Sequence, residues 1–311
     1  MKSVLMIRKT LEIEEITHKE EEFQVGLIKI KNQGNLLDSN MTTKKEINIA
    51  INGIFGKMGS TVFSAANNQE DIITIAGIDP VIEKINNKFS VPVYVDIEQM
   101  SKVSKPDVMI DFTNGKVAAK SISQALSKGI HVVSGSTGLS DKEYSALEKD
   151  SINNNVGFIS APNFAIGAIL LMHLSGIASE YFEYADLIES HHEMKIDSPS
   201  GTAISILESM TKDKTGDFKS NKAEIEDEIK NTRGGNYKNI NVHSARMPGR
   251  VARHEVVFGA LGQTLTLIHD SINRESFMPG VMLCVRKVKD FSGQGVIFGL
   301  DKVLGLGKNE H

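Results

Sequence analysis

The stretch that most constrains the fold is a strand, a glycine-rich turn, a helix and a second strand in direct succession. Alternating apolar residues predict a strand over Glu46–Asn52, which leads into Gly53-Ile-Phe-Gly-Lys-Met-Gly59. Apolar residues at helical spacing continue to Ala66, and a second strand is expected over Ile72–Ile78. Strands joined through a helix in this way lie parallel, so the pattern predicts a parallel α/β sheet.

The turn itself has the chemistry of a dinucleotide-binding site. Gly53, Gly56 and Gly59 would let the backbone approach a pyrophosphate, and the following helix start offers free N–H groups with a partial positive charge. Asp79 ends the second strand at about the 20-residue spacing expected of a carboxylate on the adenosine ribose. A glycine-rich turn that binds nothing is the alternative, but the order of strand, turn, helix, strand and acid favours a cofactor site.

The residues at the end of the second strand favour NADH over NADPH. A carboxylate at Asp79 suits a free 2′-hydroxyl, and Pro80 stands where an arginine would hold a 2′-phosphate. Lys57 in the glycine turn is still able to reach a phosphate, so NADPH stays open.

Strands and helices keep alternating as far as Ser160, which predicts a Rossmann-type doubly wound sheet with helices on both faces. Polar segments follow three of the predicted strands, at the strand ends where ligands bind in such sheets. We expect them on the nicotinamide side, with ordinary turn chemistry as the alternative. The segments are Phe112-Thr113-Asn114, Gly135-Ser136-Thr137-Gly138 and Pro162-Asn163-Phe164.

The second half of the chain has a different pattern. Ile166–Ala178 is apolar on nearly all faces and predicts a buried helix. Strands follow, including a hairpin through Gly259-Ala-Leu-Gly262, so we expect a second α+β domain with an open mixed or antiparallel sheet. An open sheet needs a cover, and another subunit is one candidate. A helix over Phe277–Val288 and a strand over Gly295–Leu300 are expected to return to the first domain.

The motif Glu189-Ser-His-His-Glu-Met-Lys-Ile-Asp-Ser-Pro-Ser-Gly-Thr-Ala203 holds the densest chemistry in the chain. His191, His192 and Lys195 precede a helix start at Ser200-Gly201-Thr202, where N–H groups and hydroxyls would bind a carboxylate. Imidazole and ammonium groups there would bind an anionic substrate and deliver a proton. Purely structural histidines remain an alternative. No metal is expected, because no third ligand has zinc-type spacing and a lysine repels a cation.

Net charge, apolar runs and cysteine content limit the classes of partner and the cellular location that we expect. The net charge of −4 gives no reason to expect nucleic acid, and no apolar run reaches the roughly 18 residues of a spanning helix. Cys284 is the single cysteine, which fits a reducing cytoplasmic setting. Met1–Lys45 is rich in Lys and Glu and is expected to be a poorly ordered extension, with a true start at Met41 as one explanation. The charged stretch Ser220–Lys230 predicts a solvated helix or loop.

These motifs together resemble the dihydrodipicolinate reductase family, also named 4-hydroxy-tetrahydrodipicolinate reductase, of bacterial lysine and diaminopimelate synthesis. The resemblance runs from about Ile47 to Leu300 and rests on the motif at Glu189–Ala203, supported by His269–Val281, HDSINRESFMPGV. It implies reduction of 4-hydroxy-tetrahydrodipicolinate by NADH or NADPH with loss of water, in a homotetramer that pairs through its second-domain sheet.

The resemblance also implies roles. His191 and Lys195 would be catalytic, and His192, Ser200, Gly201 and Thr202 would bind the substrate. The expected cofactor residues are Gly53, Phe55, Gly56, Lys57, Met58, Asp79, Phe112, Thr113, Gly135, Ser136, Thr137, Pro162, Asn163 and Phe164. The chain departs from the family at Ser136, where threonine is usual, and in the two residues before His254.

We expect an extension at 1–45, a dinucleotide-binding domain at 46–163, a substrate-binding and oligomerisation domain at 164–275, and a C-terminal segment at 276–311 that returns to the first domain. Two other functions stay open. One is an amino-acid dehydrogenase of the same architecture, such as an aspartate dehydrogenase. The other is a dinucleotide sensor without catalysis, although a sensor has no need of an acid such as His191. Arg246 and Arg250 are further candidate carboxylate ligands.

Overall fold

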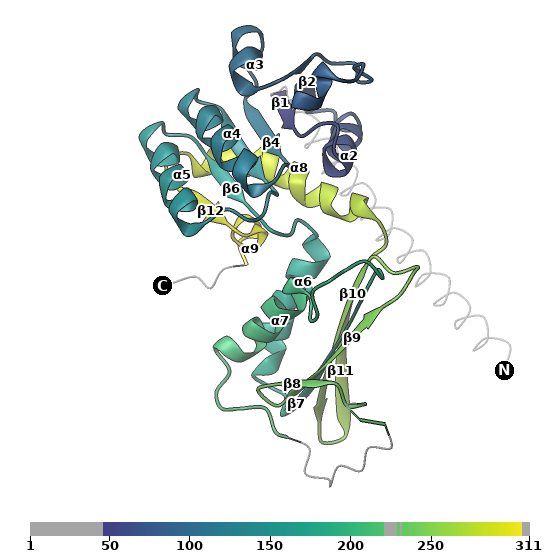
Figure 1. Ribbon diagram of the computed structural model, residues 1–311. Helices are drawn as coiled ribbons and strands as arrows, with labels where there is room; N and C mark the ends of the chain where they lie inside the picture. Colours follow the sequence, from purple (N-terminus) through teal and green to yellow (C-terminus); the bar gives the residue numbers. More distant parts are fainter. Residues whose placement is uncertain (1–45, 221–228, 231, 307–311) are drawn as a thin grey trace, which may run out of the picture. The chain divides into compact units, whose positions relative to one another are not determined.

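The structure is a computed structural model that describes residues 46–220, 229–230 and 232–306. The described chain contains a seven-stranded sheet and a five-stranded sheet (Figure 1). The extension expected at residues 1–45, and residues 221–228 of the charged stretch, lie outside the described residues. Within the described residues, no helix is both long and apolar enough to span a membrane.

The first sheet has the order β12-β6-β5-β4-β1-β2-β3, with every pair of neighbours parallel. Its strands are β1 (Ile47–Asn52), β2 (Ile72–Ile78), β3 (Val93–Tyr94), β4 (Val108–Asp111), β5 (His131–Ser134), β6 (Phe158–Ser160) and β12 (Val296–Phe298). Its helices are α2 (Lys57–Ala66), α3 (Ile97–Val103), α4 (Gly115–Ser127), α5 (Asp141–Asn153), α8 (Met278–Lys287) and α9 (Leu300–Leu304).

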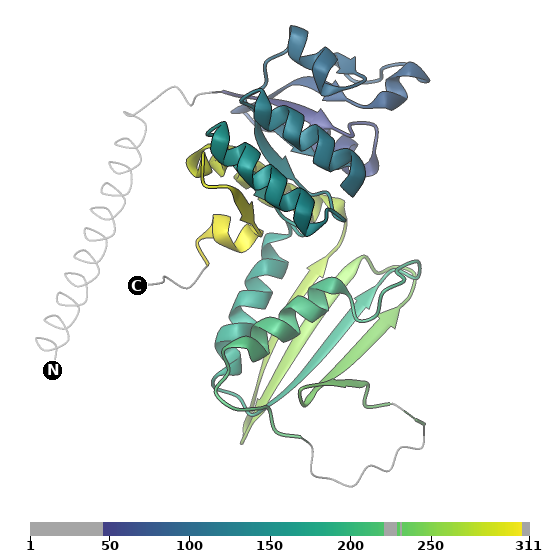
Figure 2. The ribbon, with the colours of Figure 1, turned by 60° about the vertical axis from the view of Figure 1, so that its left-hand side comes forward.

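Two apolar cores cover the two faces of this sheet. On β1, Ile49 and Ile51 point into the core shared with α2 and α8, while Ala50 points into the core shared with α3, α4 and α5. This is the period-two alternation of a strand that is buried on both faces. Figures 1 and 2 show α4 and α5 on one side and α8 on the other. The predicted doubly wound sheet is therefore confirmed.

Some element boundaries differ from those expected. The strand expected over Gly295–Leu300 is only β12, because Gly299 has φ +96° and the chain turns there into α9. The two-residue strand β3 and the helix α3 were not predicted, although Asp96 is the N-cap of α3 and accepts a hydrogen bond from the Gln99 amide. Short 3₁₀ turns also extend α8 at both ends, over Arg274–Phe277 and Val288–Phe291.

The second sheet has the order β11-β10-β7-β9-β8 and is mixed, because β7 and β9 are parallel while the other neighbours are antiparallel. Its strands are β7 (Tyr184–His191), β8 (Gly235–Tyr237), β9 (Ile240–Arg246), β10 (Ala252–Ala260) and β11 (Gln263–Ser271). The helices α6 (Ile166–Ser179) and α7 (Gly201–Lys212) cover one face of it (Figure 2).

The expectation that α6 is buried on nearly all faces is wrong. Leu170, Leu174 and Ile177 are 38%, 46% and 51% exposed, at spacings that place them on one side of the helix. The opposite side packs on α7 and the second sheet. The apolar composition of α6 predicted more burial than the structure shows, because a helix that lies over a sheet needs only one apolar face.

Candidate active site

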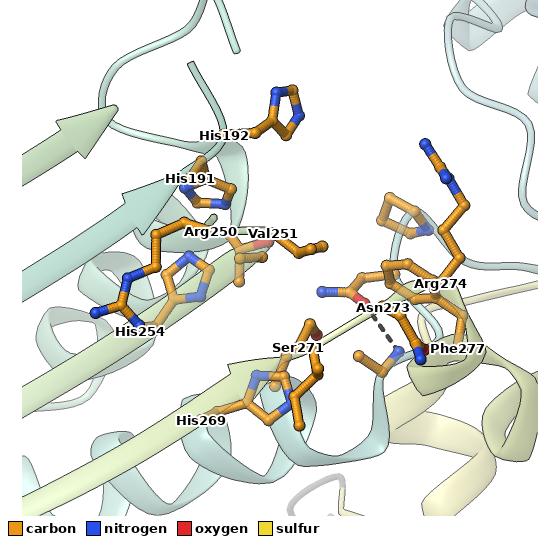
Figure 3. A pocket seen from close by; sticks show the side chains of 17 residues that line it. His191, His192, Arg250, Val251, His254, His269, Ser271, Asn273, Arg274 and Phe277 are labelled. Carbon is orange, nitrogen blue, oxygen red and sulfur yellow. Dashed lines mark hydrogen bonds between the residues drawn. The ribbon is translucent and has the colours of Figure 1, made fainter. Parts of the chain in front are cut away.

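A cavity of about 540 Å³ opens between the end of the first domain and the second sheet. Figure 3 shows His191, His192 and His254 on one side of it, with Asn273, Arg274 and Phe277 opposite. Residues from five parts of the chain meet here: Pro162, Asn163, Ala165, Ala168, His191, His192, Thr202, Arg250, Val251, Ala252, His254, His269, Ser271, Ile272, Asn273, Arg274 and Phe277.

His191 is the last residue of β7 and is held by a carboxylate behind it. Its ring is 7% exposed, and its Nδ1 lies 2.5 Å from Oε2 of Glu189. Burial alone would raise the pKa of Glu189, but hydrogen bonds from His191, Arg246 and Ser244 outweigh burial and lower the pKa to about 2. Glu189 is therefore a buried carboxylate that stays ionised near neutral pH.

Arg246 is not available as a substrate ligand. Its Nη1 and Nη2 donate to the two oxygens of Glu189, each at 2.9 Å, and Nη2 also donates to the carbonyl of Asp197. This fork geometry is the strong form of an arginine–carboxylate pair. Arg250 does line the cavity, and its Nη1 lies 3.6 Å from a carboxylate oxygen of Asp270.

Ser200 is the N-cap of α7, as predicted, and its Oγ accepts a hydrogen bond from the Ala203 amide at 3.1 Å. The hydroxyl also bonds Nε2 of His254 at 3.1 Å, and the Ser200 amide donates to Glu189 at 3.2 Å. Ser200 is 1% exposed, so its groups are used within the protein and not in the cavity. Thr202 does line the cavity, and the space above Gly201 is open.

Lys195 is not among the residues that line this cavity. Its Nζ forms an ion pair at 2.8 Å with Oδ1 of Asp197, and a hydrogen bond from Lys195 is the main reason that the pKa of Asp197 is lowered. Asp197, in the loop between His191 and Ser200, is therefore the partner of Lys195. His192 follows β7 and is exposed at the rim of the cavity.

His254 is a site residue to which no role was assigned from the sequence. It is 2% exposed on β10, directly opposite Glu189 in the sheet, and its ring centroid lies 5.2 Å from that of His191. Burial, followed by the nearby charge of His191, lowers its pKa to about 4. The alternation of β10, in which His254 shares a face with Val256 and Phe258, was the available signal.

The glycine turn after β1 has the geometry of a pyrophosphate cradle. Gly53 has φ +81°, and a Cβ on Gly59 would lie 2.1 Å from the Gly53 carbonyl oxygen. Asp79 ends β2, and its two carboxylate oxygens accept hydrogen bonds from the amides of Phe55 and Val81, at 3.1 and 3.0 Å. A bare backbone turn beside a fixed carboxylate fits a dinucleotide.

The expected nicotinamide-side residues divide between a buried network and the cavity. The buried Asp111 accepts hydrogen bonds from Thr113 Oγ1 and Ser134 Oγ, both at 2.8 Å, and Ser136 Oγ accepts from the Thr113 amide. The rings of Phe112 and Phe164 pack together in the core, with centroids 5.8 Å apart. Phe164 is 2% exposed, so it supports the site from behind, while Pro162 and Asn163 reach the cavity.

Comparisons with known proteins agree with this geometry. Residues 47–164 match the family model described as dihydrodipicolinate reductase, N-terminus, and residues 167–304 match dihydrodipicolinate reductase, C-terminus. A 4-hydroxy-tetrahydrodipicolinate reductase of Dehalococcoides mccartyi is 38% identical over 265 residues, covering 84% of this chain and 99% of the relative. One from Streptococcus uberis is 40% identical over 258 residues, covering 83% and 99%.

The chain belongs to the dihydrodipicolinate reductase family.

A solved structure supports the family at the level of the fold. The dipicolinate-bound dihydrodipicolinate reductase from Paenisporosarcina sp. TG-14 has a TM-score of 0.75 and 32% sequence identity, and covers 83% of this chain and 99% of its own. A scyllo-inositol dehydrogenase from Lactobacillus casei, at 13% identity and a TM-score of 0.55 over 85% and 93% of the two chains, shares only the fold. Dihydrodipicolinate reductases are oxidoreductases that use NADH or NADPH.

Proposed function

We propose that this protein reduces 4-hydroxy-tetrahydrodipicolinate to tetrahydrodipicolinate, with loss of water, in the diaminopimelate route to lysine. The observation that carries the proposal is His191, anchored by Glu189, facing a cavity that also holds Thr202 at the start of α7. A dianionic substrate needs cationic and N–H ligands, and its reduction needs a proton donor.

His191 is the proton donor in this proposal. Because its Nδ1 is engaged with Glu189, its Nε2 is the nitrogen left for the substrate. Lys195 acts as the second catalytic group when substrate is bound. Its ion pair with the exposed Asp197 is of the partly solvated kind that contributes about 1 kcal/mol or less, so a substrate anion would be able to displace it.

One substrate carboxylate is held at the start of α7. Thr202 and the open backbone at Gly201 offer hydrogen-bond donors beside the positive end of the helix, and His192 stands at the rim. Ser200 contributes indirectly, by capping α7. Arg250 and Arg274 line the same cavity and add to its positive charge.

The dinucleotide is held by the cradle after β1. Gly53, Gly56 and Gly59 allow close approach of a pyrophosphate, and the first turn of α2, with Lys57, faces it. When bound, the reduced dinucleotide supplies the hydride. Asp79 favours NADH, because a carboxylate fixed by two backbone amides would repel a 2′-phosphate. Phe55, Met58, Phe112, Thr113, Gly135, Ser136 and Thr137 complete the proposed cofactor contacts.

The larger organisation is also a proposal. We infer domains at 46–163 and 164–275 with a C-terminal segment from 276, since β12 and α8 pack with the first sheet. We infer a homotetramer built through the uncovered face of the second sheet, and a cytoplasmic location, which suits the single buried Cys284. No nucleic acid is expected, given the net charge of −4.

The test is an absorbance assay of NADH and NADPH oxidation by the purified protein, with substrate generated in place by the upstream synthase. The proposal predicts substrate-dependent oxidation, faster with NADH at equal concentration. Oxaloacetate with ammonia in place of the substrate tests the aspartate dehydrogenase alternative. Dinucleotide binding without turnover of either substrate would instead support a sensor.

A further inference from the structure

One buried carboxylate joins the proton donor to the carboxylate-binding helix. Glu189 is 0% exposed on β7 and bonds His191 Nδ1 at 2.5 Å, the amide of Ser200 at 3.2 Å, and both terminal nitrogens of Arg246. Arg246 in turn holds the Asp197 carbonyl, in the loop between His191 and Ser200. A single side chain therefore contacts the ring of His191, the N-cap of α7 and, through Arg246, the loop between them.

We propose that Glu189 is a positioning residue, which fixes the His191 ring with Nδ1 toward the protein and Nε2 toward the cavity and holds that ring in register with the start of α7. The inference rests on the proposed reductase function. Glu189 contacts His191 and does not line the cavity, so it acts only through its neighbours.

The proton balance explains why a carboxylate suits this position. In the proton-donating form both ring nitrogens of His191 carry hydrogen, and Nδ1–H donates to Glu189. The Nε2–H bond breaks and its proton goes to the substrate, while Nδ1–H stays on the ring and remains donated to Glu189. Water restores the proton to Nε2 before the next turnover. Glu189 takes no proton in this cycle, which agrees with its pKa of about 2.

Arg246 makes the arrangement tolerable in a buried site. An unpaired carboxylate in the interior is costly, whereas a bidentate guanidinium supplies both charge and hydrogen bonds. Because Arg246 bonds both carboxylate oxygens and His191 contacts one of them, the carboxylate has little freedom to rotate. Rigid placement of a general acid relative to its substrate increases the rate of the catalysed step.

The kinetic test compares Glu189→Gln, which keeps the shape but loses the charge, with Glu189→Asp, which keeps the charge. We expect Glu189→Gln to lower kcat by roughly 10²-fold, the scale of a general acid's contribution, with NADH affinity unchanged. Glu189→Asp should recover part of the loss. The solvent deuterium isotope effect on kcat should rise in Glu189→Gln, because proton transfer becomes slower relative to other steps.

A matched control distinguishes the loss of His191 positioning from the general effect of losing a buried ion pair. Asp71 is 5% exposed and accepts hydrogen bonds from Arg286 at 2.6 and 2.8 Å, and neither residue lines the cavity. Asp71→Asn should lower the free energy of unfolding but leave kcat and the isotope effect as in the wild type. If Glu189→Gln behaves like Asp71→Asn, Glu189 is only structural and the proposal is wrong.

A spectroscopic reading on the wild type completes the test even if Glu189→Gln does not fold. Protein with ¹⁵N-labelled histidine gives the protonation state of each ring nitrogen, and His191→Ala assigns the His191 signals. The proposal predicts that Nδ1 of His191 carries hydrogen, because it donates to Glu189. An unprotonated Nδ1 would overturn it. Absence of wild-type turnover would instead count against the proposed reductase function. The ¹⁵N signals of the His191 ring would still test its contact with Glu189.

Discussion

At the scale of single residues, the site sets two neighbouring histidines apart by their partners. His191 has an ionised carboxylate on its Nδ1, whereas His254 bonds only the hydroxyl of Ser200 and has no partner for Nδ1 among the described residues. Burial keeps His254 neutral, whereas His191 has a negatively charged partner in Glu189. These contacts support the proposal that His191 carries the chemistry and that His254 supports it.

The first prediction concerns His191→Ala. Removal of the proposed proton donor should lower kcat by roughly 10²-fold or more at saturating substrate, on the usual scale of general acid catalysis. His192→Ala is the matched comparison and should act mainly on KM, because His192 stands at the cavity rim. Steady-state kinetics of the two variants measure the difference. An unchanged kcat in His191→Ala would remove it from the mechanism.

The second prediction concerns stability and pH. The pKa of His254 is about 4 in the folded protein, below its ordinary 6.5, so the unfolded chain binds the proton first as the pH falls. The stabilisation is complete above about pH 6.5 and is lost progressively toward pH 4, amounting to about 2 kcal/mol between pH 7 and pH 5. His254→Gln, which does not titrate, should show a shallower decline.

Urea denaturation of both proteins at pH 7 and pH 5 measures this difference. His131 and His269 also have pKa values lowered mainly by burial, so part of the decline should persist in the variant. Equal declines in wild type and His254→Gln would contradict the assignment of a buried neutral imidazole to His254.

At the scale of elements, local pattern predicted the first domain well. The glycine turn between β1 and α2 and the position of Asp79 follow from period and spacing, and both are confirmed. The role of Glu189 was missed, because Arg246 is brought to it only by the parallel pairing of β7 with β9. The ion pair of Lys195 with Asp197 also could not be predicted from the sequence, because a loop with several charged residues offers a lysine more than one partner.

The third prediction concerns the turn at Gly59. A methyl group there would lie 2.1 Å from the Gly53 carbonyl oxygen, so Gly59→Ala must displace the start of α2. We expect weaker NADH binding, measured by fluorescence titration. Gly235→Ala on β8 is the control, since its added methyl lies 3.9 Å from the Val242 carbonyl oxygen and should leave NADH affinity unchanged. Unaltered affinity in Gly59→Ala would argue against a dinucleotide cradle.

At the scale of the whole molecule, the second sheet has helices on one face only, as far as the described residues extend. Ile188 and Ile268 project from the other face, 37% and 52% exposed, on either side of Glu255 in the ladder. β11 is also an edge strand with mostly exposed residues. An open face with an unpaired edge favours association with further copies of the chain.

The fourth prediction is that Ile268→Lys dissociates the proposed tetramer into smaller species. Four charged side chains would meet in a tetramer built on this face, and their repulsion would oppose assembly. Sedimentation velocity of the wild type and the variant measures it. Val103→Lys is the control, since Val103 is 75% exposed on α3 in the other domain. A wild type that sediments as a monomer would contradict the proposed assembly.

The most direct test of the central claim follows an atom from cofactor to product. NADH that carries deuterium in place of the transferred hydride is incubated with the protein and synthase-generated substrate. The mass of the product is then measured by mass spectrometry. We predict tetrahydrodipicolinate that is heavier by one deuterium, formed only when protein, substrate and NADH are all present. A substrate that remains unreduced, or a product without deuterium, would contradict the proposed reaction.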